Sequence, residues 1–307
     1  MRAVCNEEKS IMKNHKVQLS YHLMMAPAVI MLLIFCYAPM FGIAIAFQDF
    51  VPAKGILGSR WVGLDNFKFM FALPDVGQVL TNTIIISFFK IILGILVPVC
   101  FALLLNEIRL KFFKKTVQTI VYLPHFLSWV VLAAVVQYIF GFGGPINDLA
   151  ASTGGSRTLF MASNTWFQPI CILTDTWKEF GYGSIIYLAA LTSIDPGLYE
   201  ASAIDGANRW QQLLHVTLPG IVPTIVLMVT MSLPNILNAN FDQIYNLYNP
   251  LVYQTGDIID TYVYRIGMVQ REYSFATGVG LIKSTVGMVL MVVANQLTIK
   301  LTGRKMF

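Results

Sequence analysis

Uninterrupted apolar stretches of twenty residues or more constrain this chain more than any other feature of its sequence. Hydrophobic residues make up 56% of the 307 residues and charged residues only 12%, whereas ordinary soluble domains carry about 25% charge. A soluble core does not require apolar runs of this length, but a helix that crosses the ~30 Å hydrocarbon layer of a bilayer does. The chain is therefore expected to be an integral membrane protein.

Six windows are long enough to cross a bilayer, so the predicted fold class is all-α transmembrane. They run over residues 22–47, 80–105, 117–140, 165–192, 219–238 and 276–301. Several contain proline, which membrane helices tolerate because neighbouring helices satisfy the freed backbone groups. The first window follows a basic tail, as a secretory signal does, but it exceeds the roughly 7–15 apolar residues of such a signal. We expect an uncleaved first span.

The positions of lysine and arginine orient the six predicted spans. Basic residues precede the first span, fill the short link between the second and third, and close the chain: Arg2, Lys9, Lys13, Lys16, Arg109, Lys111, Lys114, Lys115, Lys300, Arg304 and Lys305. Such segments face the cytoplasm. The predicted organisation is a cytoplasmic tail over residues 1–21, a membrane domain over 22–302 and a cytoplasmic C-terminus over 303–307.

Several other classes of protein are disfavoured. The formal net charge is +5, but the bases lie between apolar segments and not on one face of a polar domain, which argues against a nucleic-acid partner. The four cysteines and four histidines are scattered, so no metal site is predicted. Residues 278–285 superficially imitate a phosphate-binding loop, but Ile282 stands where glycine must precede the lysine.

The polar link over residues 193–218 is the most informative stretch of the sequence. Asp195 is a good N-cap and Pro196 fits the first turn of a short helix. Gly206 can adopt the left-handed conformation that ends a helix. A second short helix is expected over residues 208–216, before Pro219 opens the fifth span. Such a helical elbow is either a docking surface for a cytoplasmic partner or an interfacial hairpin on lipid headgroups.

The residues of this link resemble the EAA signature of binding-protein-dependent ABC importer permeases. The pattern is carried by Glu200-Ala201-Ser202, by Asp205-Gly206-Ala207 and by the trailing 216–219 segment, Val-Thr-Leu-Pro. Ser202 replaces the second alanine of the signature, a small-for-small change. The resemblance extends over nearly the whole chain to the maltose-type sugar permeases. More narrowly, residues 241–253 and 257–264 resemble the subgroup that serves polysaccharide fragments such as aldouronates.

The resemblance implies a type I ABC importer permease, a six-helix bundle whose coupling helix sits in a cleft of a cytoplasmic ATPase subunit. The implied coupling residues are Glu200, Ala201, Ser202, Asp205, Gly206, Ala207 and Pro219. It also implies a second, non-identical permease, two ATPase subunits, an extracytoplasmic solute-binding protein and an oligosaccharide substrate. The chain itself is then no enzyme and binds no cofactor, because ATP and Mg belong to the ATPase. The implied location is the bacterial cytoplasmic membrane.

Polar residues inside the fourth and fifth spans are candidates for the substrate path, because ionisable groups at membrane depth are costly unless they face protein or water. The competing interpretations are a structural Asp175–Lys178 pair, three residues apart on a helix, an interfacial anchor for the tryptophan, and polar contacts between helices. The candidates are Asp175, Trp177, Lys178, Glu179, Asn235, Asn238, Asn240, Asp242 and Tyr245.

Three further points stay open at this level. Lys90 and Lys283 are isolated bases that are expected to extend toward headgroups. Lys178, Arg265 or Arg271 would offset the carboxylates of an acidic sugar. A self-sufficient secondary transporter is the alternative function, although inverted repeats with ion-coupling acids are expected of that class and one cytoplasmic elbow fits it poorly.

Overall fold

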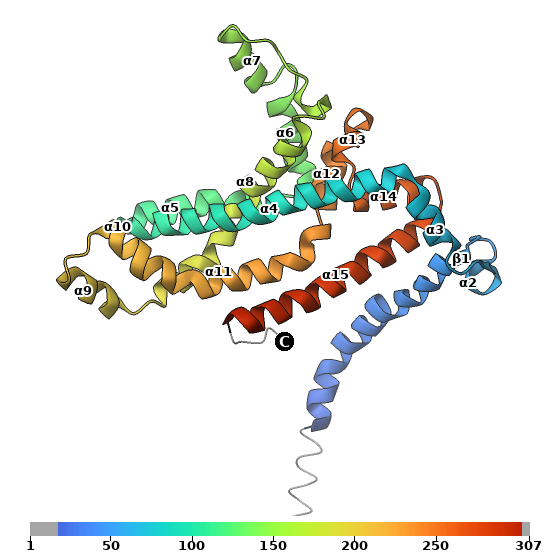
Figure 1. Cartoon of the computed structure of the whole chain (residues 1–307), viewed down its shortest axis with the longest axis horizontal. Helices are drawn as coiled ribbons and strands as arrows, with labels where there is room; N and C mark the ends of the chain where they lie inside the picture. The colour runs from blue at the N-terminus through green and yellow to red at the C-terminus, as the bar shows by residue number, and fades with distance from the viewer. Residues whose placement is uncertain (1–17, 303–307) are drawn as a thin grey trace, which may run out of the picture.

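The computed structural model describes residues 18–302, and nearly all of them are helical (Figure 1). In this range the strands are a two-residue antiparallel pair, β1 (Gln48–Asp49) and β2 (Arg60–Trp61), with Gln48 opposite Trp61. The all-α prediction is therefore confirmed. Most of the predicted N-terminal tail, with its bases, and the predicted C-terminal segment 303–307 lie outside the described residues.

Five long helical segments form the body of the molecule. They are the N-terminal helix (Gln18–Phe47), α4 (Pro74–Glu107), α8 (Phe167–Thr192), α11 (Leu218–Ser232) with its extensions, and α15 (Tyr273–Thr302). The shorter α-helices are α2 (Gly55–Gly58), α3 (Asp65–Ala72), α5 (Lys111–Tyr122), α6 (Trp129–Phe140), α7 (Pro145–Ser152), α9 (Pro196–Ile204), α10 (Arg209–Gln212), α12 (Phe241–Leu247), α13 (Tyr253–Gly256) and α14 (Ile259–Tyr264). Tighter or wider turns are η1 (Leu33–Tyr37), η2 (Ala38–Phe47), η3 (Leu123–Phe126), η4 (Phe160–Ala162), η5 (Leu213–Thr217), η6 (Leu233–Leu237), η7 (Pro250–Val252) and η8 (Arg265–Val269).

The third predicted span, 117–140, is not one helix. The 3₁₀ turn η3 follows α5, and the backbone is extended at Leu127 and Ser128 before α6 starts. Pro124 lacks the N–H that would continue an α-helical ladder, and the Ser128 hydroxyl accepts a hydrogen bond from the N–H of Val131 at 3.4 Å, which caps the new helix. The window therefore contains two helices that point in different directions (Figure 1).

Five helical segments within residues 18–302 are long and apolar enough to cross a membrane: Gln18–Phe47, Pro74–Glu107, Trp129–Ser152, Arg209–Leu237 and Tyr273–Gln296. The fourth predicted span, α8, is not among them, although its 26 residues reach about 39 Å at the helical rise of 1.5 Å per residue. Its charged residues Asp175, Lys178 and Glu179 lower its apolarity. The prediction of six membrane spans therefore remains a prediction, and α8 can be the fourth span only if its charged residues find partners inside the protein.

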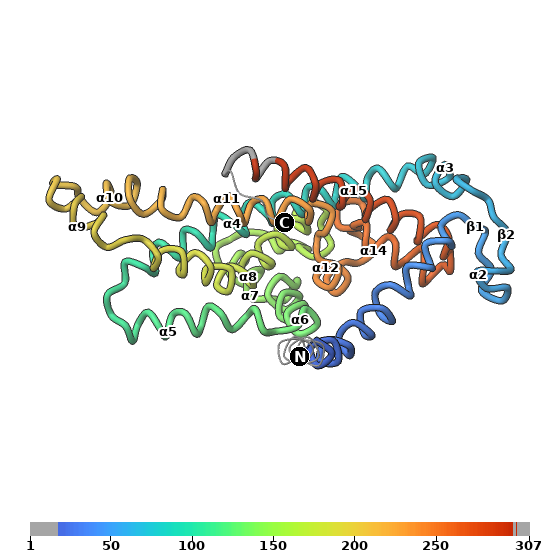
Figure 2. The backbone as a smooth tube through the Cα atoms, turned by 90° about the horizontal axis from the view of Figure 1, so that it is seen from below, coloured from blue at the N-terminus to red at the C-terminus, as the bar shows by residue number. Residues whose placement is uncertain are grey.

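The core is built around the parallel contact of α4 with α8, in which Lys90 meets Asp175 and Pro98 meets Gly183. One apolar cluster joins α4, α6, α8 and the α12–α14 region, and another joins α4, α8 and α11. Close approach of α5 to α8 depends on Gly181, because a Cβ atom there would lie 2.3 Å from the Val121 carbonyl oxygen. Figure 2 shows α8 and α12 between α11 and α15 on one side and α5 and α6 on the other.

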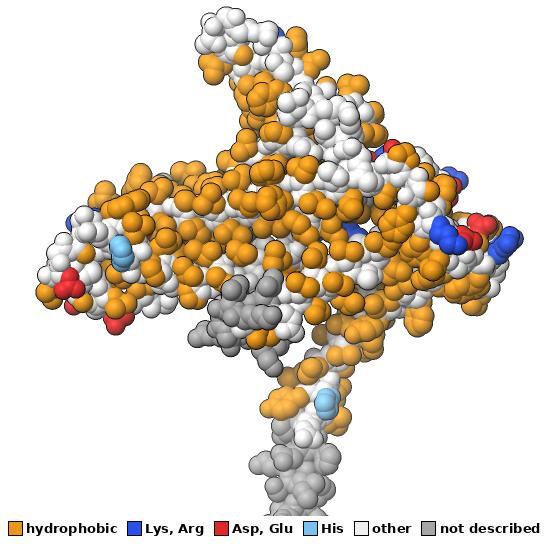
Figure 3. All heavy atoms as spheres, in the orientation of Figure 1, with side chains coloured by type: hydrophobic (Ala, Val, Ile, Leu, Met, Phe, Trp, Pro, Cys, Tyr) orange, Lys and Arg blue, Asp and Glu red, His pale blue; other side chains and the backbone are white. Residues whose placement is uncertain are grey.

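The N-terminal helix contacts the rest of the bundle mainly through its last part, where η2 packs against α15. None of its most apolar 18-residue window is buried, and in Figure 1 it extends away from the bundle on the side opposite α6 and α7. Figure 3 shows apolar side chains along the length of the bundle, with charged side chains gathered near α2 at one end and near α9 at the other. This distribution is that of a protein whose middle faces lipid.

Substituting Gly181→Ala is expected to destabilise the bundle, because the new methyl group meets backbone that cannot rotate away. Overpacking of this kind costs roughly 1–3 kcal/mol. The matched control is Gly94→Ala in α4, where a Cβ meets nothing within 4 Å. Thermal unfolding of the purified protein should show a lower midpoint temperature for Gly181→Ala and an unchanged midpoint for Gly94→Ala. Equal midpoints for the two variants would contradict the close approach.

Candidate functional site: a helical elbow and a polar cluster between helices

The elbow, residues 195–218, forms as the sequence predicts. The Asp195 carboxylate accepts a hydrogen bond from the Gly197 N–H at 2.9 Å and caps α9, with Pro196 in the first turn. Gly206 has a φ of 81°, a conformation that only glycine adopts at no steric cost. Asn208 and Gln211 form a reciprocal capping box at the start of α10.

Hydrogen bonds inside the elbow hold its two arms together. The Ser202 hydroxyl donates to the Tyr199 carbonyl at 2.8 Å and accepts from the Gln212 amide at 3.1 Å. The hydroxyls of Tyr199 and Thr217 lie 3.0 Å apart. Because these contacts join α9 to the helix that follows it, the elbow can move as one rigid body.

The outer surface of the elbow is free to contact another protein. Among the predicted coupling residues, Glu200, Ala201, Asp205, Gly206 and Pro219 are exposed, and Ser202 and Ala207 are half-buried. Large apolar side chains are also exposed, with Ile204 at 87% and Trp210 at 67%. Exposed apolar groups beside charged ones are typical of a docking surface.

The second arm of the elbow does not end before the fifth span, contrary to expectation. One helical segment runs from Arg209 to Leu237 over 29 residues, about 44 Å at 1.5 Å per residue. The chain passes Pro219 because a wider turn, η5, precedes it, with the Leu218 N–H bonded to the Leu213 carbonyl. We call this segment the lever, since one end lies at the elbow and the other at residues 235–240.

A polar cluster of Lys90, Asp175, Asn240 and Gln243 lies at the far end of the lever. The Lys90 ammonium donates to the Ala239 carbonyl at 2.9 Å and to the Gln243 side chain, and it lies 3.4 Å from an Asp175 oxygen. The Asn240 amide donates to Asp175 at 3.1 Å. The cluster therefore ties α4, α8 and the start of α12 together.

This arrangement corrects two sequence-level expectations. Lys90 does not extend toward headgroups, since its side chain is 7% exposed and fully engaged inside the bundle. Asp175 pairs with Lys90 and not with Lys178. The sequence signal for Lys90 was its position in the middle of an apolar window, where an ionisable residue has to find a partner.

A second group of ionisable residues lies where the α5–α6 break meets α8. Lys178 donates to the His125 carbonyl and to Glu179, both at 2.8 Å, and the other Glu179 oxygen lies 2.7 Å from the His125 ring. The His125 ring stacks on Tyr182 at 3.9 Å. Sequence reasoning missed His125 and Tyr182, because only the break between α5 and α6 brings this histidine to α8.

The remaining predicted path residues lie at different places. Trp177 is 46% exposed and, at 100° per residue, points about 200° away from Asp175 around α8. Asn235, Asn238 and Asp242 are exposed, as is Tyr245 at 40%. Among the candidates the fold thus brings two pairs into contact, Asn240 with Asp175 and Lys178 with Glu179.

Further along the chain, two more cations are neutralised within the protein. Arg265 contacts Asp257 and lies over the Tyr253 ring at 4.7 Å, and Lys283 contacts Asp260. Lys283 was also expected to extend toward headgroups, and that expectation is wrong. With Lys178 bound to Glu179, two of the three bases suggested for an acidic sugar already have a carboxylate.

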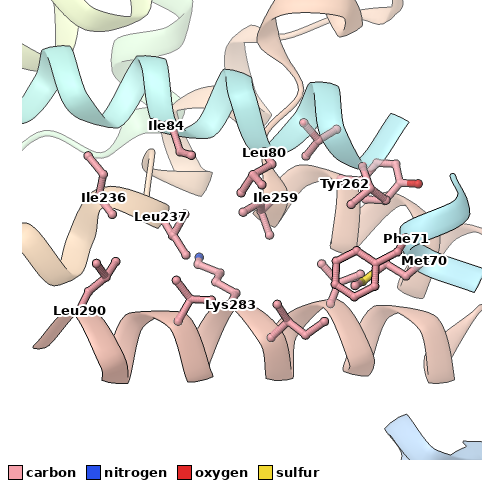
Figure 4. A pocket seen from close by; sticks show the side chains of 15 residues that line it. Met70, Phe71, Leu80, Ile84, Ile236, Leu237, Ile259, Tyr262, Lys283 and Leu290 are labelled. Carbon is pink, nitrogen blue, oxygen red and sulfur yellow. The ribbon is translucent and has the colours of Figure 1, made fainter. Parts of the chain in front are cut away.

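Lys283 extends into a cavity of about 520 Å³ between α4 and α15 (Figure 4). Apolar side chains line nearly all of it, among them Met70, Leu80, Ile236 and Leu290. A hydroxyl-rich ligand would lose its hydrogen bonds to water here without replacement. The cavity is therefore a poor sugar site, and the polar cluster is the better candidate. Among the described side chains, no group of three or more His, Cys, Asp or Glu could hold a metal ion.

Sequence comparison assigns the chain to a family. Residues 99–301 match the family described as binding-protein-dependent transport system inner membrane component, and the chain belongs to it. It is 43% identical over 280 residues to the polygalacturonan/rhamnogalacturonan transport system permease protein YteP of Bacillus subtilis (strain 168), covering 91% of this chain and 87% of that protein.

Solved structures agree with this assignment. A chain of a bacterial ABC transporter involved in the import of the acidic polysaccharide alginate superposes with a TM-score of 0.88 at 38% identity, covering 95% of this chain and 99% of that one. The same transporter in complex with an alginate pentasaccharide-bound periplasmic protein gives a TM-score of 0.87 at 37% identity, covering 95% and 98%. The fold is that of an ABC importer permease.

Replacing Lys90→Met is expected to destabilise the protein by roughly 3–5 kcal/mol, because the buried Asp175 carboxylate then has no counter-charge. Adding Asp175→Asn should restore part of the loss, which a double-mutant cycle of thermal unfolding detects. The control is Lys68→Met, which removes an ion pair whose side chains are 76% and 68% exposed and should change little. Additive effects of the Lys90 and Asp175 substitutions would contradict a functional pair.

Proposed function

We propose that this chain is the permease subunit of an ATP-driven importer for oligosaccharides released from polysaccharides, acidic ones included. It would work in the bacterial cytoplasmic membrane, with both termini and the elbow in the cytoplasm. Its partners would be a second, non-identical permease, two ATPase subunits that hold ATP and Mg, and an extracytoplasmic binding protein. The observation that carries the proposal is the rigid, exposed elbow at one end of a lever whose other end lies at a polar cluster.

In this mechanism the lever couples ATP hydrolysis to the opening of the substrate path on one side of the membrane or the other. Closure of the ATPase subunits on nucleotide would pull the elbow at Glu200 and Gly206. Because hydrogen bonds join the elbow to the lever, the pull would move residues 235–240. This movement would rock the helices that line the substrate path, so that the path opens to the outside of the cell. The ion pair between Arg209 and Glu107 at 2.9 Å joins the same motion to the end of α4.

The sugar path would pass the exposed edge of the polar cluster. Asp175, Glu179 and Tyr182 lie four and seven residues apart on α8 and so share one face. Asn235, Asn238 and Asp242 add exposed amide and carboxylate groups at the end of the lever. These groups suit hydroxyls, and the neutralised cations nearby indicate that this chain recognises rings and hydroxyls more than carboxylates.

Replacing Gly206→Leu should abolish coupling while leaving the protein in the membrane. A leucine at this left-handed φ is strained by roughly 1–3 kcal/mol, so the elbow surface changes shape. The matched control is Gly63→Leu, whose φ is 61° and whose Cβ also meets nothing within 4 Å. In proteoliposomes holding the whole complex, Gly206→Leu should lower import and binding-protein-stimulated ATP hydrolysis about tenfold, and Gly63→Leu should not; normal import by Gly206→Leu would refute the coupling role.

The substrate class is tested by uptake. The complete complex in proteoliposomes, with its binding protein outside and ATP inside, is given labelled fragments of pectin, alginate and xylan, from dimers to pentamers. The proposal predicts ATP-dependent accumulation of at least one series. Uptake by this chain alone without ATP would establish the secondary transporter instead, and no uptake of any fragment would contradict the oligosaccharide class.

A further inference from the structure

A second cavity, separate from the polar cluster, lies between α12, α14, η8 and α15. Its volume is about 410 Å³, within the roughly 300–1,000 Å³ of small-molecule sites. Its lining includes the rings of Phe241, Tyr264 and Tyr273, the Asp260 carboxylate and the Thr277 hydroxyl. None of these side chains belongs to the polar cluster or to the elbow.

One wall of this cavity is a fixed group of aromatic rings. The Phe241 and Tyr264 rings are 5.6 Å apart between centroids, and both contact Tyr245, at 5.1 Å in a stacked and 5.0 Å in an edge-on arrangement. Each of the three rings is thus held by the other two. The wall offers preformed apolar faces, which lose little entropy when a ligand binds against them.

The lining of the cavity also supplies hydrogen-bonding groups. Asp260 is 25% exposed and uses one carboxylate oxygen for Lys283, so its second oxygen can accept from a ligand hydroxyl. Thr277 donates to the Tyr273 carbonyl at 2.7 Å, which leaves its oxygen as an acceptor. A lipid chain in this space would give the second Asp260 oxygen no hydrogen-bond donor, which carries a cost. A sugar ring has both an apolar face of C–H groups and hydroxyls at its edge.

The cavity lies directly beside the polar cluster. Asn240 reaches Asp175 in the cluster, and the next residue, Phe241, lines the cavity, so their Cα atoms are about 3.8 Å apart. Asn240 has a φ of 72°, a left-handed conformation that asparagine tolerates better than most residues. At this turn the side chain of Asn240 lies at the polar cluster and that of Phe241 lines the aromatic cavity.

We infer that the cavity between α12, α14 and α15 is a second sugar subsite, which holds one ring of an oligosaccharide while neighbouring rings lie at the polar cluster. The inference rests on the proposed function. It predicts that the cavity contributes only when the sugar is long enough to reach both sites, so its side chains set a preference for chain length.

The test compares import of short and long sugars by the complete complex. Tyr264→Leu removes one face of the aromatic wall, Tyr264→Phe keeps the ring, and Phe88→Leu in α4 removes a ring that is 49% exposed and does not line the cavity. The probes are the shortest and the longest fragments that the unmodified complex imports from the pectin, alginate and xylan series. Basal ATP hydrolysis and the size-exclusion profile report whether each variant assembles.

The subsite predicts that Tyr264→Leu lowers import of the longest fragment about three- to tenfold, the size of an aromatic contact, and leaves the shortest unchanged. Tyr264→Phe and Phe88→Leu should import both normally. Equal losses for short and long fragments would assign Tyr264 a structural role, and no loss for either would leave the cavity outside the path; each result overturns the subsite. If the unmodified complex imports none of the sugars, the proposed function itself fails, and the subsite with it.

Discussion

A charge at membrane depth has to be neutralised inside the protein, and this requirement organises much of the bundle. Lys90 is held by Asp175, Lys178 by Glu179, Arg265 by Asp257 and Lys283 by Asp260. Since an unpaired buried ion costs several kcal/mol, the pairs that join different helices, Lys90 with Asp175 and Lys283 with Asp260, fix the distance and the rotation between those helices. The pair of Lys90 and Asp175 also fixes the turn at Asn240, where the lever ends and α12 begins.

The same constraint explains how a polar site can exist within an apolar bundle. Charges that are already paired create little net field, so the space beside them can hold hydroxyl-rich ligands without binding any ion tightly. In the apolar cavity beside α15, Lys283 is the charged residue among the lining side chains, whereas the aromatic cavity beside α12 offers the Asp260 carboxylate and the Thr277 hydroxyl. The lever then relates the polar cluster to the elbow, because the lever begins in the elbow and ends at Leu237, shortly before Ala239 and Asn240 contact the cluster.

Local sequence signals predicted the elbow well and the interior poorly. The Asp195 cap, Pro196 in the first turn and the left-handed Gly206 depend on neighbouring residues, which a sequence displays directly. The partners of Lys90 and Lys178 lie far away in the chain, with Asp175 85 positions from Lys90 and His125 53 from Lys178. Only the folded contact of α4 with α8, and the break after α5, decide which charges meet.

The windows of apolar residues show the same division. They located the long helices. Hydropathy is the same whether or not the backbone of an apolar stretch is interrupted, so it did not predict the break at Leu127 and Ser128. The sequence reading also missed that the lever continues as one helical segment through Pro219, because proline is normally expected at the start of a helix and not within a longer one. Both differences arise at a proline: the 3₁₀ turn η3 contains Pro124, before the break, and the wider turn η5 precedes Pro219, where the helix continues.

The central claim, that the lever transmits motion as one body, can be measured by the distance between spin labels in the assembled transporter. Ile204, in α9 of the elbow just before the lever, and Met231, near the far end of the lever, are 87% and 53% exposed, and Phe69 in α3, 60% exposed, serves as the outside reference. Binding of ATP should leave the Ile204–Met231 distance unchanged and alter the Met231–Phe69 distance. A change between Ile204 and Met231 with none between Met231 and Phe69 would mean that the segment bends at its prolines and carries no motion to the polar cluster.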